Sequence, residues 1–357
     1  MYRLSVHSFE YLLQTIYADI SPKGPGGSNH VPPIIKLCMA LRFAAGGSYL
    51  DLSFGYDVPE NTIHHYVMQV ITAIAMSKNP FLDNIKSPIH CSETELLQME
   101  NGFAKLSNCV LRGTVAAGDG IVFRMQMPDA NEVNGDVISY YTRKGYYAYG
   151  LQGFCDSTCK FVSISSIVCS SSGDNTAYIV TQLARDIKAG LLPDKFHIVF
   201  DEAYVCKKQE MSPHKGRNLS REKDAFNYYL SLNSQVIERA FGILVQRWGV
   251  LWRPLRLNME HRGLMIMALC RLHNVCIDDF GLVRASKLRR NSCSGFERED
   301  DGDGRITPQF IDYNFGGQGT RTDLELCDHR REWTEIVKEL GLSRPAFSKH
   351  TKRAIRP

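Results

Sequence analysis

The chain has 357 residues, a formal net charge of +4 and 44% hydrophobic residues. This composition is typical of a globular protein, and the length allows two domains or one large domain with appendages. The longest apolar stretches, such as 110–117 and 263–270, are well short of the about 20 residues of a bilayer span, so the sequence predicts no membrane helix.

Residues 1–78 are predicted to be helical. Phe9, Leu12 and Ile16 recur at helical spacing, and a segment rich in Gly, Pro and Ser then ends this first helix. An amphipathic helix at 34–44 and a short helix at 48–55 follow.

A turn at 57–61 joins the short helix to another helix that starts with TIHHYVMQ. Two helices joined by a tight turn, the second with a polar start, fit a helix-turn-helix. A plain helical bundle has the same pattern, so DNA binding or dimerisation and simple packing both remain open. The candidate DNA contacts on this helix are Asn61, Thr62, His64 and His65.

Residues 79–109 are predicted to be a polar connector, after which the apolar period becomes that of β-strands. Three successive antiparallel strands are predicted, at 110–127, 146–156 and 160–169. A helix at about 175–189, the buried strand FHIVFDEAY and the helix containing VIERAFGIL complete the pattern. This order predicts an α/β fold with an RNase H-like core of mixed sheet and flanking helices, at 110–283.

Beyond this core, residues 284–320 are polar and charged, which predicts a flexible linker. Residues 321–357 are predicted to hold a last amphipathic helix, at about 324–340, and a basic tail. The tail fits either a nuclear address or a frayed end.

The N-terminal segment MYRLSVHSFEYLL lacks the features of a secretion signal, and the 11 scattered cysteines fit reduced core thiols. Two groups were considered as zinc ligands: Cys155 with Cys159, and Cys270 with His273 and Cys276. Neither group has paired CxxC units, so packing is favoured, with His273 and Asn274 capping a helix.

Three acidic residues carry the main functional signal. Asp119 and Asp201 lie inside β-type apolar runs, and Glu238 lies on an amphipathic helix. A carboxylate in such a place requires a partner, and no Lys or Arg stands beside Asp119 or Asp201. A hard divalent cation would supply that partner, which points to phosphodiester chemistry.

Basic residues gather around these acids. Residues 205–262 contain 11 Lys and Arg against five acids, an excess of 11 minus 5, or +6. A polyanionic substrate would lie against such a face, although a solvated basic surface is the alternative. The candidate contacts with the DNA backbone are Lys207, Lys208, Lys215, Arg217 and Arg221.

Several motifs in combination resemble the PIF/Harbinger class of DDE transposases and the nucleases derived from them. They are GDG at Asp119, SSSGDN at Asp174, DEAY at Asp201, SPHKGRNLSREKDAFNYYLS, VIERAFGILVQRW and LHN. The resemblance covers roughly residues 9–283. FDEAY also mimics a Walker B strand, but the chain has no G-x-x-x-x-G-K-[ST] loop.

The resemblance implies an Asp-Asp-Glu triad, here Asp119, Asp201 and Glu238, separated by 82 (201 minus 119) and 37 (238 minus 201) residues. It further implies two divalent ions, Mg²⁺ or Mn²⁺, at the scissile phosphate, with Asp119 bridging both. Ile121 and Val122 stand where the family usually has a Thr-His-like pair. A Myb-like partner protein for DNA-end recognition is also implied.

The sequence therefore predicts a metal-dependent DNA endonuclease of transposase origin that acts on double-stranded DNA in the nucleus. The cytoplasm is a second location left open, and so is a homodimer. The main alternative is a domesticated chain that is catalytically weak or inactive and serves as a DNA-binding or protein-interaction module. A carboxylate-pair glycosidase fits poorly, because the chain has a basic loop and lacks an aromatic-rich sugar surface.

Overall fold

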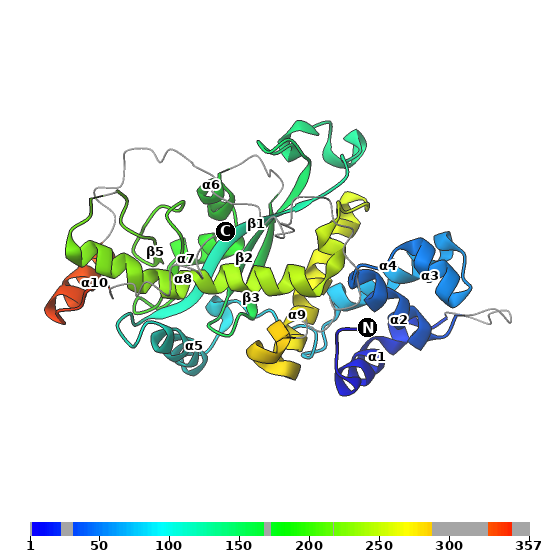
Figure 1. Cartoon of the computed structure of the whole chain (residues 1–357), viewed down its shortest axis with the longest axis horizontal. Helices are drawn as coiled ribbons and strands as arrows, with labels where there is room; N and C mark the ends of the chain where they lie inside the picture. The colour runs from blue at the N-terminus through cyan, green and yellow to red at the C-terminus, as the bar shows by residue number, and fades with distance from the viewer. Residues whose placement is uncertain (1, 23–30, 168–172, 217, 288–327, 345–357) are drawn as a thin grey trace, which may run out of the picture.

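The computed structural model describes residues 2–22, 31–167, 173–216, 218–287 and 328–344. A bundle of N-terminal helices lies beside a five-stranded mixed sheet that is flanked by further helices (Figure 1). Within the described ranges, none of the helices combines the length and the apolarity needed to span a bilayer.

Four helices build the N-terminal region, as predicted: α1 (Val6–Ile20), α2 (Pro33–Ala44), α3 (Tyr49–Tyr56) and α4 (Glu60–Met76). Ser48 and Asp51 form a capping box that starts α3. Asp57 ends α3 in the left-handed conformation, with φ of 53°, and the chain then turns directly into α4. Two helices joined by a tight turn are therefore present, while their assignment as a helix-turn-helix stays a prediction.

The segment predicted to be a polar connector contains a helix that the sequence analysis did not predict. After a short 3-10 helix, η1 (Pro88–His90), α5 spans Glu93–Leu106 and packs against the first strand. Ser92 and Glu95 form a capping box at its start, a local signal that the polar composition of the segment concealed. The domain boundaries themselves stay predictions.

The sheet has the strand order β3-β2-β1-β4-β5. Its strands are β1 (Thr114–Arg124), β2 (Ala148–Cys155), β3 (Phe161–Ile167), β4 (His197–Val199) and β5 (Glu210–Met211). The first three strands are antiparallel, whereas β4 and β5 run parallel to β1. This is the predicted RNase H-like arrangement, with β5 as an addition inside the predicted basic loop.

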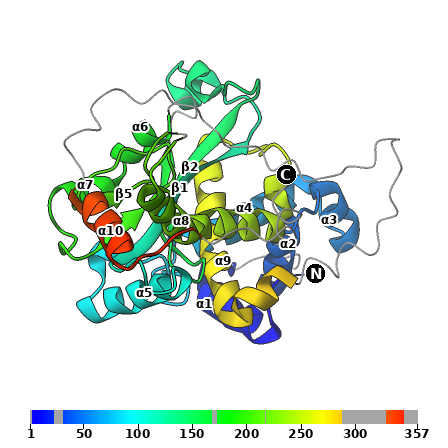
Figure 2. The same ribbon diagram turned by 60° about the vertical axis from the view of Figure 1, so that its left-hand side comes forward.

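Helices cover both faces of the sheet (Figure 2). One face packs against α6 (Asp174–Ile179) and α7 (Gln182–Lys188), which replace the single helix predicted at 175–189 because Thr181 caps a new start. The other face packs against α8 (Arg221–Arg247) and α9 (Met259–Lys287). α10 (Asp328–Glu339) packs against α8. Three short 3-10 helices complete the described elements, η2 (Ala130–Val133), η3 (Ile138–Tyr140) and η4 (Gly249–Trp252).

The C-terminal part differs from the prediction in one respect. The core was predicted to end at 283, but α9 continues to Lys287 and so extends into the linker predicted at 284–320. The predicted last helix agrees with α10 over the residues the structure describes. The rest of the linker and the basic tail, at 288–327 and 345–357, lie outside the described residues.

The long helix α9 joins the two parts of the molecule, because α4 packs against it within one continuous hydrophobic core. His273 and Asn274 do not cap a helix, contrary to the prediction, but are fully buried in the middle of α9. Asn274 accepts a hydrogen bond from the Phe161 amide and donates one to the Phe161 carbonyl, each at 2.8 Å. The four cysteines considered as zinc ligands are buried, free thiols.

Candidate active site

Two acids lie side by side where the parallel pairing of β1 with β4 ends, Asp119 within β1 and Asp201 just beyond β4. In the register of these strands Ala117 is opposite Val199. Asp119 and Asp201 each follow two residues later, so both point to the same face of the sheet at neighbouring positions. The carboxyl ends of parallel strands are the usual place for functional groups in α/β sheets.

The long helix α8 brings a third acid to this edge. Asp119 is paired with Gly153 on β2, and a Cβ atom on Gly153 would lie 2.8 Å from the ring of Phe241. The missing side chain thus allows Phe241 to pack directly on the sheet beside Asp119. Glu238 lies three residues earlier on the same face of α8, so this contact directs it toward the strand-end acids.

A fourth acid, Asp174, approaches from the opposite face of the sheet. It is the first residue of α6, and its Oδ1 atom lies 3.1 Å from the position that a Cβ atom on Gly120 would occupy. Asp174 was noted only as part of the SSSGDN motif and was missing from the predicted catalytic set. Its spacing from the other acids is set by tertiary packing, which no local pattern encodes.

The four carboxylates repel one another. Burial raises the pKa of Asp119 well above its usual range, and Asp201, Asp174 and Glu238 raise it further, against a hydrogen bond from the Gly120 amide. Burial followed by the charge of Asp201 raises the pKa of Asp174 to about 7.

The other two acids of the cluster are shifted in the same direction. Burial raises the pKa of Asp201, while the Ala203 amide and the charge of Lys215 oppose this. Burial and then Asp201 raise the pKa of Glu238, although this side chain reaches solvent. The charged form of each carboxylate is therefore disfavoured when no cation is bound.

A buried hydrogen-bond chain supports the central acid. The hydroxyl of Tyr204 donates to Oδ1 of Asp119 at 3.4 Å, and Nε2 of Gln152 donates to that hydroxyl at 2.7 Å. Tyr204 and Gln152 are at most 1% exposed, and Oε1 of Gln152 has no hydrogen-bond partner in the described structure. The sequence analysis missed both residues, although the tyrosine belongs to the DEAY motif.

The donor set fits a hard divalent cation. All four acids offer oxygen ligands, and among the described residues no ion pair joins any of them to a Lys or Arg. A cation of the Mg²⁺ or Mn²⁺ type prefers such ligands and would relieve the repulsion. In the described part of the chain, no three Asp, Glu, His or Cys side chains are arranged so that they could hold a metal ion together.

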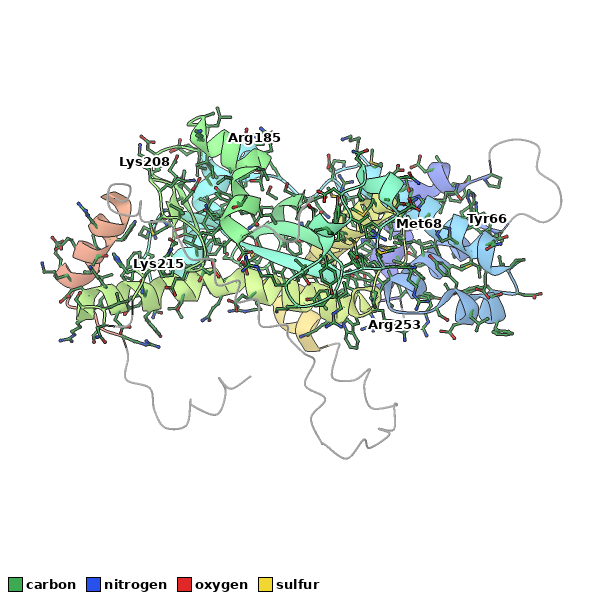
Figure 3. The ribbon with its side chains drawn as sticks, turned by 90° about the horizontal axis from the view of Figure 1, so that it is seen from above. Tyr66, Met68, Arg185, Lys208, Lys215 and Arg253 are labelled. Atoms are coloured by element: carbon green, nitrogen blue, oxygen red, sulfur yellow. The ribbon has the colours of Figure 1, made fainter. Side chains whose placement is uncertain are left out.

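The predicted basic DNA contacts have different surroundings. Lys207 pairs with Glu210 at 2.5 Å and Lys208 with Asp194 at 2.8 Å, so both already neutralise acids of the protein. Lys215 is exposed and close enough to Asp201 to affect its pKa. Figure 3 shows Lys208 and Lys215 at the sheet end of the molecule, away from Tyr66 of α4. Arg221 is exposed at the start of α8, whereas Arg217 lies outside the described residues.

The predicted contacts on α4 also differ among themselves. Asn61 and His65 are exposed, and Thr62 is partly buried. His64 is turned inward, with its ring 6.2 Å from the ring of His261 at the start of α9. The start of α4 is therefore partly a surface and partly a contact with the rest of the protein.

Comparison with known families agrees with this fold. The family model described as DDE superfamily endonuclease matches residues 118–274, less than half of the chain. The matched range begins one residue before Asp119 and contains all four clustered acids. It supports a DDE transposase-like family with a nuclease domain, without a subtype. No curated protein and no solved structure matched the chain significantly.

Proposed function

We propose that this chain is a divalent-metal-dependent DNA endonuclease of the PIF/Harbinger type, with Asp119, Asp201 and Glu238 as its catalytic acids. One observation carries the proposal: two acids where the parallel pairing of β1 and β4 ends, and one acid from α8, act on one another's charge and form no ion pair with a Lys or Arg among the described residues. Side chains that repel one another in this way are costly to a fold and are typical of functional sites.

Asp119, Asp201 and Glu238 would hold two divalent ions, either Mg²⁺ or Mn²⁺. Asp119 is the best candidate for the shared ligand, because the other acids of the cluster all act on its pKa. Bound cations would supply positive charge to stabilise the phosphate in the transition state. Asp174 adds a fourth carboxylate from the opposite face and is proposed to complete this site.

The protein itself contributes orientation. Tyr204 and Gln152 restrain the Asp119 carboxylate through the buried hydrogen-bond chain. Packing of Phe241 on Gly153 fixes the position of α8 and hence of Glu238. Such restraint reduces the reorganisation required when the substrate phosphate arrives.

Double-stranded DNA is the proposed substrate, with Lys215, Arg217 and Arg221 as backbone contacts and the start of α4 as a further contact. Lys207 and Lys208 are weaker candidates, because each forms an ion pair inside the protein. A nuclear location, a Myb-like partner protein and a homodimer stay predictions.

Nicking of supercoiled plasmid tests the proposal. Wild type should nick DNA with Mg²⁺ or Mn²⁺ and not with EDTA, and Asp201→Asn should abolish nicking while binding of DNA is retained or strengthened, since a negative charge near the phosphates is lost. Glu202→Gln is the matched control, because Glu202 is the exposed neighbour and also loses one charge. Equal nicking by wild type and Asp201→Asn would refute the mechanism. Metal-independent binding without any nicking would favour the non-enzymatic module.

A further inference from the structure

A cavity of about 390 Å³ lies where the start of α4 meets the residues after β1 and the start of α9. Its lining includes His64 from α4, Gln126 and Glu132 from the segment after β1, and Arg256, His261 and Arg262. Two guanidinium groups and two imidazoles thus share one open cavity with a single carboxylate among the lining residues of the described structure. This composition favours an anionic ligand.

Arg262 provides the strongest reason for this assignment. Its side chain is 2% exposed, and its Nε atom has no hydrogen-bond partner in the described structure. Nη2 donates to the Gln126 carbonyl at 3.2 Å, while Nη1 contacts only the sulfur atoms of Met125 and Met259, at 3.2 and 2.8 Å. Sulfur is a weak acceptor, so most of this buried guanidinium is unsatisfied.

Arg271, another buried arginine of α9, has the hydrogen-bond and ion-pair partners that a buried guanidinium group normally requires. Arg271 donates to the carbonyls of Ile74 and Ser77 and forms an ion pair with Asp83 at 2.7 Å. No ion pair joins Arg262 to a carboxylate in the parts of the chain that are described. A buried cation without an anion is costly, and a ligand that supplies the anion would remove this cost.

The neighbouring groups strengthen the positive character of the cavity. Arg256 is exposed at its rim and adds a second guanidinium. Burial lowers the pKa of His64, and the imidazoles of His261 and His65 lower it further, so His64 offers a neutral N–H donor and no charge. Glu132 is exposed and close enough to Arg262 to raise its pKa, and it limits the number of anions the cavity can hold.

We propose that this cavity binds one phosphate group of the DNA backbone, several nucleotides away from the cleavage site. Guanidinium groups bind phosphate oxygens in pairs of hydrogen bonds, and neutral imidazole N–H groups add donors. The cavity also includes part of the start of α4, where DNA contact was predicted. Use of the DNA backbone as the source of the phosphate rests on the proposed nuclease function.

The fold also gives an approximate distance along the DNA between this phosphate and the cleavage site. Gln126 follows Asp119 by seven residues (126 minus 119) along β1 and its extension, where the Gln126 amide still donates to the Leu255 carbonyl. An extended chain rises about 3.3 Å per residue, which gives roughly 23 Å. With about 3.4 Å per nucleotide step, the bound phosphate would lie about seven nucleotides from the scissile one.

Thermal unfolding with inorganic phosphate, at constant ionic strength and without metal, tests the anion site directly. Wild type should show a saturable rise in Tm, and Arg262→Met should lose it, since methionine fits beside Met125 and Met259 without a charge. Arg253→Ala is the control, because Arg253 is an exposed arginine three residues before Arg256 and does not line the cavity. An equal phosphate response in wild type and Arg262→Met would overturn the proposal.

If Arg262→Met does not fold, Arg256→Ala replaces it, because Arg256 is an exposed lining residue. Its phosphate response should weaken severalfold, and an unchanged response would then overturn the proposal.

Metal-free binding of DNA duplexes distinguishes backbone phosphate from free phosphate. For a long duplex, loss of the contact should flatten the slope of log affinity against log salt by about 0.9. For a duplex that extends fewer than about seven nucleotides from the cleavage site, wild type and variant should bind equally. A phosphate response without a DNA effect would overturn the DNA assignment. Because neither assay requires cleavage, a chain that fails to nick plasmid can still support or refute this site.

Discussion

Replacement of Asp174 by asparagine should stabilise the metal-free protein at neutral pH. Asp174 is half-buried beside Gly120, at a distance where Asp119 and Asp201 interact with its charge. Asparagine has nearly the same shape as the protonated carboxyl group and carries no charge. The substitution therefore removes repulsion while the packing of α6 is retained.

The expected size follows from the pKa of Asp174, which is raised from 3.8 to about 7. Between these pH values the folded protein holds a proton that the unfolded chain has released, so stability falls as pH rises from about 4 to about 7. The full difference corresponds to about 4 kcal/mol, at about 1.36 kcal/mol per pKa unit. Solvent that reaches this half-buried side chain reduces the value, so Asp174→Asn should gain about 2 to 4 kcal/mol at pH 8.

Urea unfolding in EDTA at pH 4 and pH 8 provides the measurement. The two proteins should have nearly equal free energies of unfolding at pH 4 and should diverge at pH 8. Glu10→Gln, an exposed acid on α1, controls for the loss of one negative charge. Added Mn²⁺ should then stabilise wild type more than Asp174→Asn. A variant that is less stable than wild type at pH 8 would refute the repulsive cluster.

Two further changes test the site and the DNA surface. Gly153→Ala would place a Cβ atom 2.8 Å from the Phe241 ring and should lower the free energy of unfolding by about 1 to 3 kcal/mol. The same clash should displace Glu238 on α8 and reduce nicking. Gly55→Ala is the control, because a Cβ atom there meets open space and nicking should be unchanged. Replacing Lys215 and Arg217 by alanine should flatten the salt slope of metal-free DNA binding by about 1.8, or about 0.9 per lost contact, and unchanged slopes would mean that this face does not bind DNA.

Much of the fold could be predicted because its elements carry strong local signals. The strands β1, β2 and β3 have continuous apolar runs, and α8 has a clear apolar face, so their order already indicated an RNase H-like core. The helix α5 escaped prediction, since 14 residues with many polar side chains conceal a start that depends on Ser92 and Glu95. The break between α6 and α7 depends on one side-chain cap, from Thr181.

The site could be predicted only in part, for a related reason. Asp119 and Asp201 were recognisable because a charge inside an apolar strand violates the local pattern. Asp174 violates no such pattern, since an acid at the start of a helix is favourable by itself. Its relation to the other acids results from the packing of α6 on the far face of the sheet. Tyr204 was not predicted as a site residue either, because an aromatic residue after a buried strand is typical of the hydrophobic core.

Arg262 shows most clearly why a charge count cannot identify a binding site. It was counted with ten other basic residues between 205 and 262 as part of one basic face. In the structure Lys207 neutralises Glu210 and Lys208 neutralises Asp194, so these charges are largely satisfied within the protein. Arg262 instead is buried with sulfur atoms and one carbonyl oxygen as its partners. An exposed cation can be satisfied by water, whereas a buried one requires an anion, and a residue that lacks one inside the fold is the better candidate for binding one from outside.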